Sequence, residues 1–557
     1  MHPEIIQYDK TYKLIEFGKG SEKLSLDFRY VFSSILKLGE TIRLGDTDCD
    51  LKDMPGPYIC CTYDRSAAKK EMTGTGLSCG KDYLFAEDLF YLLDDLKGSK
   101  IAYATCSKKI SDRLKAVSFG YAAKHGKILP EDPYAQILSG GRRRSSRSPV
   151  IQRLYHAIYL IPGLIEAIPQ LFASGKEYEG YDLICFADAA NAIGYKKDHP
   201  DAGDRVITTE MLKARTMASL HMRAVYFDKD QYTCECDMPF KTLWIGKGGT
   251  ARLCDCPDYL DVSCGNIGVL SASDVWDSPM ARIIRLSVIN NTYTFCSKNL
   301  CGKFAGGCRS AEVLKRTDIT AADHPLTINI ANDQVCNLHC PSCRKKVYAV
   351  NDECTQREAD ACMDELINSG WLDTADKLLV GGGGEAFLSA NYKRVLYDGS
   401  IRRNSITIMT NGTLFTGDEW KRLEGKYEHI SFMVSVDAAT KQTYEKVRCG
   451  GAYDRLMKNM DFLSKLRSEG KVESVKVIMI VQEANYREIP EFIRWAKDKG
   501  FDGVNLSRIR NWGTYDDIYF YEHVSMFDGE GRMKPELSAV LEDPECGDPI
   551  VNMNWKA

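Results

Sequence analysis

The sequence predicts an α/β protein in which a partial (β/α)6 barrel follows a cysteine-rich module and an N-terminal mixed α/β domain. From residue 321 onward, six short apolar runs alternate with helical segments. Eleven of the 21 cysteines fall between residues 234 and 343. Strands that alternate with helices indicate a parallel sheet with right-handed crossovers. The barrel therefore belongs to the C-terminal half, and the cysteine-rich module precedes it.

Length and composition set the limits of this prediction. A chain of 557 residues corresponds to three or four domains at about 150 residues each. We expect an N-terminal domain over 1–230, the cysteine-rich module over 231–320, the barrel over 321–515 and a C-terminal extension over 516–557. The chain is 44% hydrophobic and 27% charged, which excludes a disordered or collagen-like protein. A net charge of -4 gives no reason to expect a nucleic-acid partner.

Targeting features favour a cytoplasmic location. The first 30 residues lack the apolar core of a signal peptide. No apolar run approaches the roughly 18 residues of a membrane-spanning helix. Cysteines in such a chain are expected to be reduced and available to metals.

One basic loop, Arg142–Arg147, leads into an apolar stretch at 150–175, which we interpret as core helices broken by prolines. The alternative is contact of residues 142–175 with an anionic membrane surface.

The expected strands of the barrel place polar motifs at one edge of the sheet. In parallel α/β sheets, active sites form at the carboxyl ends of the strands. Each motif discussed below in this half of the chain directly follows a strand. The strands are expected at 326–330, 377–380, 405–409, 430–436, 475–481 and 503–507.

Three cysteines follow the first strand with the spacing C-x3-C-x2-C: Cys336, Cys340 and Cys343. Three thiolates on one short loop can ligate three irons of a cubane cluster and leave the fourth iron open to a substrate or cofactor. A structural zinc site is the alternative, with His339 as the fourth ligand. His339 adjoins Cys340 and would point poorly towards a shared ion, so we favour the cluster.

This triad, after the first strand of a six-stranded unit, resembles the radical S-adenosylmethionine (SAM) superfamily. The resemblance covers about 321–515. It implies a SAM-ligating 4Fe–4S cluster that reduces SAM to a 5′-deoxyadenosyl radical, which then abstracts a hydrogen atom from the substrate. The segment LLVGGGGEAFLS resembles the GGE motif of that superfamily. The resemblance implies that Gly383, Gly384 and Glu385 receive the methionine amino group of SAM.

Further SAM contacts are implied at the ends of the later strands. In similar enzymes, polar groups here contact the ribose and the SAM carboxylate, and apolar groups and backbone pack on the adenine. Arg448 would pair with the SAM carboxylate, the alternative being a surface salt bridge. The full implied set also includes Thr410, Asn411, Ser435, Asp437, Val481, Gln482 and Arg508.

Residues 231–308 resemble the SPASM module, which carries one or two auxiliary 4Fe–4S clusters in related enzymes. The resemblance rests on the Cys236-x2-Pro239 and Gly265-Asn266 pairs and on the later cysteines. In most such enzymes the module follows the barrel, whereas here it precedes the barrel. Candidate ligands are Cys234, Cys236, Cys254, Cys256, Cys264, Cys296, Cys301 and Cys308. We expect one cluster on Cys236, Cys254, Cys296 and Cys301, with Cys256 as the alternative to Cys254 and a zinc-ribbon-like site as the alternative to a cluster.

The leading functional hypothesis is a radical SAM enzyme that modifies a peptide or protein by cross-linking, epimerisation or oxidation. Its partners would be the peptide and a reductant such as flavodoxin or ferredoxin. The alternative is oxidation or epimerisation of a sugar, glycan or other small molecule, because radical SAM proteins of polysaccharide assembly also place the cysteine-rich module first. Arg142–Arg147 could then contact phosphate. A non-catalytic iron–sulfur scaffold is a third class, which the intact triad and Glu385 argue against. No catalytic acid or base is identified from the sequence.

Overall fold

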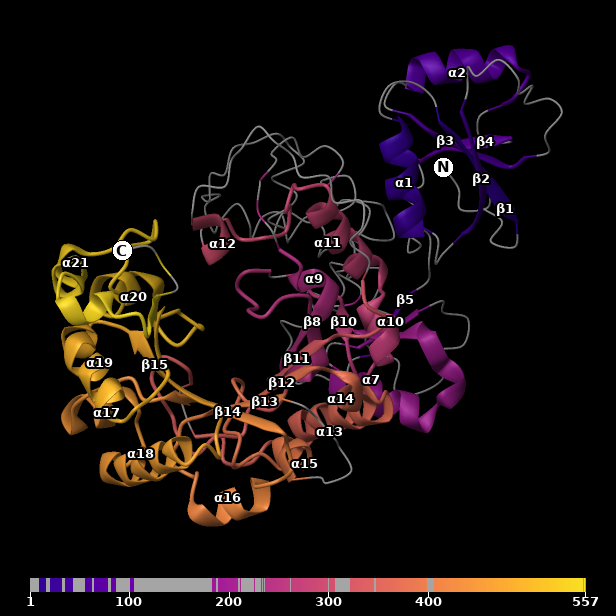
Figure 1. Ribbon diagram of the computed structural model, residues 1–557. Helices are drawn as coiled ribbons and strands as arrows, with labels where there is room; N and C mark the ends of the chain where they lie inside the picture. The colour runs from indigo at the N-terminus through magenta and orange to yellow at the C-terminus, as the bar shows by residue number, and fades with distance from the viewer. Residues whose placement is uncertain are drawn as a thin grey trace.

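The computed structural model describes parts of residues 10–104, 183–305, 321–397 and 405–555, with short gaps inside these ranges (Figure 1). The basic loop Arg142–Arg147, the apolar stretch 150–175 and Cys308 lie outside the described residues. Among the helices that are described, none combines the length and the apolar character that crossing a bilayer requires.

The C-terminal half contains all six predicted strands, and each pairs in parallel with the next along the chain. Buried residues alternate with less buried ones along β14, since one face of the sheet packs on helices and the other faces a cavity. The strands are β11 (Thr327–Ile330), β12 (Lys377–Val380), β13 (Ser405–Thr410), β14 (His429–Ser435), β15 (Ser474–Val481) and β16 (Gly503–Arg508).

Helices connect these strands and cover the outer face of the curved sheet (Figure 1). In α19 (Ile489–Asp498), Ile489, Phe492, Ile493 and Ala496 are buried, which is the spacing of a single apolar stripe. The other helices of this half are α13 (Glu353–Asn368), α14 (Trp371–Thr374), α15 (Ala390–Tyr397), α16 (Gly417–Leu423), α17 (Lys441–Val447), α18 (Tyr453–Ser468), α20 (Asp517–His523) and α21 (Pro535–Leu541).

The barrel sheet continues beyond both of its predicted edges. Strand β8 (Thr242–Ile245), within the cysteine-rich module, pairs in parallel with β11. Strands β9 (Thr250–Arg252) and β10 (Gly265–Asn266) follow antiparallel. At the other edge, β17 (Val551–Met553) pairs in parallel with β16. The module and the C-terminal extension therefore share one ten-stranded sheet with the barrel.

The N-terminal region has the predicted mixed α/β character and is built on two separate parallel sheets. The first has the order β2-β1-β3-β4 and packs with α1 (Ser21–Phe32) and α2 (Arg65–Gly74); the second has the order β5-β6-β7 and packs with α7 (Ala189–Asp198). The strands are β1 (Thr11–Glu16), β2 (Lys37–Arg43), β3 (Tyr58–Cys61), β4 (Tyr83–Phe85), β5 (Ile101–Ala104), β6 (Leu183–Phe186) and β7 (Val206–Thr208). Helix α7 lies against α13, where the Ala190 amide donates to Glu358 at 3.2 Å.

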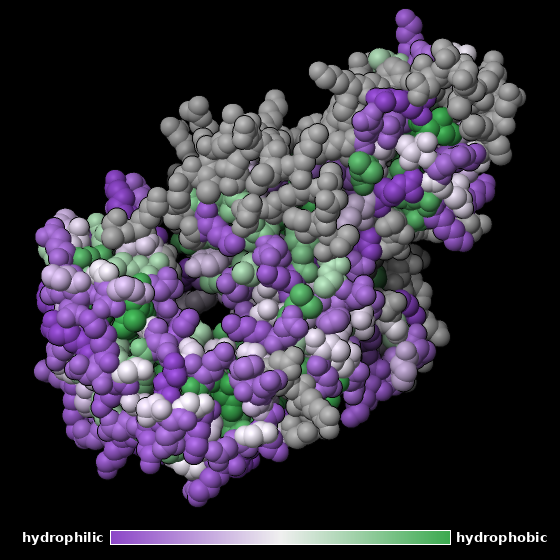
Figure 2. Space-filling model, viewed as in Figure 1, coloured by the Kyte–Doolittle hydropathy of each residue, from purple (hydrophilic) through white to green (hydrophobic). Residues whose placement is uncertain are grey.

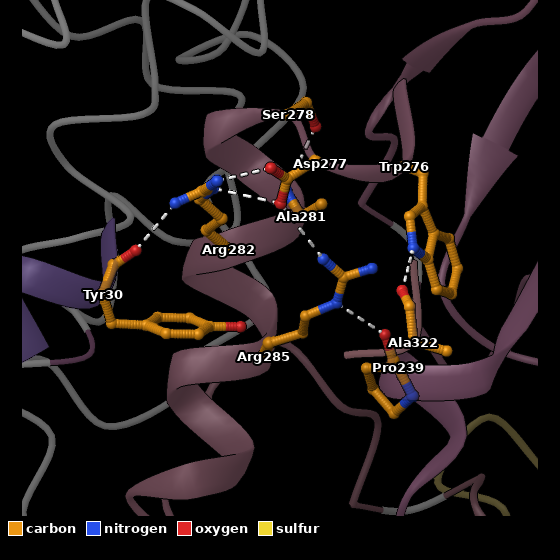
Figure 3. A network of polar contacts seen from close by, with 9 residues as sticks. All are labelled: Tyr30, Pro239, Trp276, Asp277, Ser278, Ala281, Arg282, Arg285 and Ala322. Carbon is orange, nitrogen blue, oxygen red and sulfur yellow. Dashed lines mark hydrogen bonds and ion pairs between the residues drawn. The ribbon is translucent and has the colours of Figure 1, made fainter. Parts of the chain in front are cut away.

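A buried arginine organises the cysteine-rich module (Figure 3). Arg285, on α11 (Pro279–Ile289), is 1% exposed; its Nε donates to the Pro239 carbonyl at 2.8 Å. Its guanidinium also lies over the Trp276 ring, 4.4 Å from the centroid. One turn away, Arg282 donates to the Tyr30 carbonyl at 2.9 Å and so links α11 to α1. The remaining helices of the module are α9 (Met238–Lys241), α10 (Ala272–Trp276) and α12 (Gly302–Ala305).

Candidate active site

The loop after β11 is fixed before it reaches its first cysteine. Asp333 is 1% exposed and accepts the Val335 amide at 3.0 Å and the Ser389 hydroxyl at 2.5 Å. The Tyr392 hydroxyl donates to the Asp333 carbonyl at 2.8 Å. A buried carboxylate with this many donors holds its neighbours in one conformation. The cysteine loop therefore starts from a rigid anchor.

The glycine run after β12 packs its backbone directly on this anchor. A Cβ on Gly383 would lie 2.2 Å from the Ala331 carbonyl oxygen, and one on Gly384 would lie 2.4 Å from that of Val335. No side chain fits in so short a gap. The glycines were predicted to allow close approach of SAM. What the structure shows is that they allow close approach of the chain to itself.

Each thiol of the triad has a side-chain nitrogen within reach. The pairs are Asn411 with Cys336 at 3.9 Å, Arg448 with Cys340 at 3.7 Å, and Arg344 with Cys343 at 3.3 and 3.4 Å. Burial raises the pKa of the Cys340 thiol, and the Arg448 charge acts in the opposite direction. Nitrogen donors aimed at sulfur favour the thiolate form, which is the form that ligates iron. The donor set thus fits an iron–sulfur cluster.

His339, the fourth ligand of the zinc alternative, packs against Gly450 and donates its backbone amide to the Cys449 carbonyl at 3.0 Å. Within the described residues, no three Cys, His, Asp or Glu side chains are grouped closely enough to hold a metal ion. The thiolates of a 4Fe–4S cluster bind different irons and so do not converge on one centre.

A cavity of about 1240 Å³ opens at the carboxyl ends of the strands. Figure 2 shows this face hollowed between the C-terminal helices and the cysteine-rich module. Of the predicted site residues in the barrel, those on the cavity wall are Cys340, Cys343, Gly383, Ser435, Asp437, Arg448 and Arg508. The opposite wall comes from the cysteine-rich module and includes Trp244, Arg252, Asp255, Cys256, Asp258 and Tyr259. The cavity therefore lies between the two cysteine regions.

A buried ion pair lies on the wall of this cavity. Arg448 Nε is 2.8 Å from Asp437 Oδ2, and the two side chains are 13% and 5% exposed. Asp437 has a φ of 67° and accepts the Ile480 amide at 2.7 Å, so its carboxylate is held in place by its own backbone turn. Burial raises the pKa of Asp437, and the Arg448 charge lowers it in part. The internal partner of Arg448 is thus a buried carboxylate, not one on the surface.

Other implied SAM contacts are not among the residues that line the cavity: Gly384, Glu385, Thr410, Asn411, Val481 and Gln482. Glu385 is 1% exposed, and its two carboxylate oxygens accept the Thr410 hydroxyl at 2.5 Å and the Asn411 amide at 2.8 Å. Burial raises the pKa of the Glu385 carboxyl. In this arrangement Glu385 ties the end of β12 to the end of β13, and through Asn411 to the cysteine loop.

The cysteines of the cysteine-rich module lie in distinct environments. One apolar cluster contains Cys234, Cys236, Cys296 and Cys301. Burial raises the pKa of Cys296 to about 12, and charges on Cys236 and Cys301 act in the same direction. The pKa of the Cys254 thiol is raised mainly by burial and next by the charge of Asp255. The charge of Cys296 raises this pKa further, so the two thiols lie close to each other. Cys256 faces the cavity, whereas Cys264 lies fully buried near Arg285 and Arg252.

Sequence reasoning missed Arg344 and Arg510. Arg344 stands in the basic run RKK, where the spacing gives no reason to separate it from solvent-exposed lysines. Arg510 forms an ion pair with Asp258 and so connects the end of β16 to the cysteine-rich module. Neither set of contacts could be predicted from the local sequence. Asp258 lies far from Arg510 along the chain, and Arg344 donates to the carbonyls of Gln334 and Gly383, which are not its neighbours in the sequence.

The three thiols lie at the carboxyl edge of a parallel sheet, and their sulfurs can ligate three irons of an iron–sulfur cluster. Residues 334–496 match the Radical SAM superfamily model, and the chain carries a domain of that superfamily. Members of the superfamily are enzymes that use a 4Fe–4S cluster and SAM.

Two curated relatives show how far the similarity extends. A tungsten-containing aldehyde ferredoxin oxidoreductase cofactor-modifying protein of Pyrococcus furiosus is 24% identical over 177 residues, 31% of this chain and 49% of the relative. Mycofactocin maturase MftC of Mycobacterium tuberculosis is 22% identical over 199 residues, 35% of this chain and 48% of the relative. The chain spans about half the length of these relatives.

Among solved structures, Streptococcus suis SuiB bound to precursor peptide SuiA matches with a TM-score of 0.29 and 13% identity, covering 41% of this chain and 49% of SuiB. The structure of anSMEcpe with bound AdoMet and the Cp18Cys peptide matches with a TM-score of 0.27 and 18% identity, covering 41% of this chain and 62% of that protein.

Proposed function

We propose that this chain cleaves SAM reductively and uses the resulting radical to abstract a hydrogen atom from a peptide or protein, leading to a cross-link, an epimerised centre or an oxidised side chain. The observation that carries the proposal is the cavity, which has Cys340, Cys343 and their arginine donors on one side and the cysteine-rich module on the other. A cytoplasmic location and a reductant such as flavodoxin or ferredoxin belong to the same proposal.

The bound cluster and SAM supply the electron transfer and the radical, and the chain positions them. Cys336, Cys340 and Cys343 hold the cluster. Ser435 and the Asp437–Arg448 pair form a polar wall that orients the polar end of SAM. Hydrogen abstraction requires the target carbon to be held close and water to be kept away.

The cysteine-rich wall completes the site. Cys236, Cys296 and Cys301, with Cys234 or Cys254, would hold one auxiliary 4Fe–4S cluster. Such a cluster would supply one-electron redox chemistry on this side of the cavity. Cys256 faces the cavity and remains the alternative to Cys254.

The peptide substrate is supported by the dimensions of the cavity and by a relative. The cavity of about 1240 Å³ exceeds the 300–1,000 Å³ typical of small-molecule pockets, which leaves room for a substrate beside SAM. Its rim carries two exposed aromatic side chains, Trp512 at 59% and Tyr348 at 38% exposed, which suit apolar side chains of a peptide. The relative MftC is named as a maturase.

The test is anaerobic reconstitution followed by iron and sulfide quantification and by dithionite and SAM treatment. We expect about eight irons per chain and formation of 5′-deoxyadenosine. The variant with Cys336, Cys340 and Cys343 replaced by Ala should lose about four irons and all 5′-deoxyadenosine, whereas Cys354→Ala, on the exposed face of α13, should lose neither. Zinc in place of iron would refute the proposal. A mass change in sugars but not in candidate peptides would refute the peptide substrate.

A further inference from the structure

Arg344 directly follows the third cysteine of the triad and makes contacts with three segments of the site. Its Nη1 donates to the Gln334 carbonyl at 2.8 Å, and its Nη2 donates to the Gly383 carbonyl at 3.1 Å. Its Nε and Nη2 also point at Cys343 Sγ, at 3.4 and 3.3 Å. One guanidinium thus joins the start of the cysteine loop, the glycine run and a cluster ligand.

Arg344 differs from the other two nitrogen donors of the triad in the net charge that it presents to the thiols. Asn411, at Cys336, is neutral. Arg448, at Cys340, is paired with Asp437 at 2.8 Å. Within the described residues, the hydrogen-bond acceptors of Arg344 are two carbonyls and a sulfur, and no carboxylate forms an ion pair with it. Its charge is therefore directed at the triad without a compensating anion.

The electrostatics of the site agree with this geometry. The Arg344 guanidinium nitrogens lie 3.3 and 3.4 Å from Cys343 Sγ, so its positive charge stabilises negative charge on that sulfur. A cluster gains one negative charge when it is reduced, so a cation and hydrogen bonds at its sulfurs favour the reduced form.

We propose that Arg344 sets the reduction potential of the cluster on the Cys336–Cys340–Cys343 loop, as a positioning residue that acts through Cys343. This inference rests on the proposed function, since it needs a cluster in that loop. Arg344 raises the potential by placing an uncompensated positive charge and two N–H groups at the most exposed thiolate of the triad.

The experiment is a redox titration of the reconstituted full chain, followed by electron paramagnetic resonance of the signal that changes when SAM is added. The SAM-responsive signal separates this cluster from any auxiliary one. Neutral variants are Arg344→Gln and Arg344→Met, the charge-retaining variant is Arg344→Lys, and the matched control is Arg532→Gln, an exposed arginine paired with Asp528. The two neutral variants differ in shape, so the comparison uses whichever retains the full iron content.

At the wild-type midpoint potential, we expect the neutral variants to show a reduced-to-oxidised ratio about tenfold lower, equivalent to about 59 mV for one electron. Arg344→Lys should stay closer to wild type than either neutral variant, and Arg532→Gln should match wild type. A neutral variant with full iron and an unchanged potential overturns the inference, as does an equal shift in Arg344→Lys and Arg344→Gln. A wild-type chain without a SAM-responsive signal would instead refute the proposed function.

Discussion

Replacing Gly383 by alanine tests whether the glycine run serves the chain as well as its ligand. The added Cβ would lie 2.2 Å from the Ala331 carbonyl oxygen and 2.8 Å from that of Asp333, whereas ordinary contacts begin at 3.4 Å. To restore an ordinary contact, one of the two segments must move by about 1.2 Å. Both obstructing atoms are backbone, so no flexible side chain can yield. The φ of Gly383 lies outside the left-handed region, and the cost is therefore steric alone.

Overpacking of this kind costs about 1–3 kcal/mol. At about 1.4 kcal/mol per factor of ten, the local opening equilibrium of the cysteine loop should rise about 5- to 140-fold. The measurement is hydrogen exchange of the amides in 331–343, together with iron retained after reconstitution. Gly417→Ala is the matched control, because its Cβ would meet no atom within 4 Å. Exchange in the Gly383→Ala variant that matches both wild type and this control would refute the steric argument.

Three further predictions follow from the described contacts. Cys296→Ala should remove about four irons per chain. Cys264→Ala should leave the iron content unchanged, because Cys264 lies in the core away from the other thiols. Equal iron losses in the two variants would contradict this grouping of the thiols. Arg285→Met should destabilise the fold by about 1–3 kcal/mol in thermal unfolding, through the loss of a buried hydrogen bond and an aromatic contact. Asp352→Ala should cost about 1 kcal/mol as the lost N-cap of α13, measured by exchange of its amides. Hydrogen bonds from Thr355 lower the pKa of Asp352, so this stabilisation is present above the unfolded-state pKa and is lost as pH falls through the folded-state value; a pH-independent difference between wild type and the alanine variant would count against it.

The sequence was sufficient to predict the strands and to place the cysteine triad and the glycine run at one edge of the sheet. Alternating apolar runs are a local signal, and all six predicted strands are present in the predicted order. The cysteine triad and the glycine run lie together because both follow neighbouring parallel strands. The orientation of individual side chains was not predictable. Glu385 accepts hydrogen bonds from the Thr410 hydroxyl and the Asn411 backbone amide, and only the folded sheet brings these two donors beside it.

The grouping of the auxiliary thiols also required the structure. Eight candidates with irregular spacing allow many combinations, and the structure shows which of the thiols share one apolar cluster. Cys234 joins Cys236, Cys296 and Cys301, while Cys264 lies in the core near a buried arginine. Strand β17 escaped prediction because three residues carry too little periodicity to be recognised.

The parallel pairing of β8 with β11 makes the boundary near residue 320 a poor place to divide the chain. A fragment that begins at 321 would expose the edge of β11, the kind of edge that recruits other chains and aggregates. Neighbouring strands in a sheet lie about 4.8 Å apart, so the spacing of β8 and β11 is fixed by backbone hydrogen bonds. Exchanging the cysteine-rich module for that of another protein would therefore succeed only if the replacement supplied a strand in the register of Thr242–Ile245.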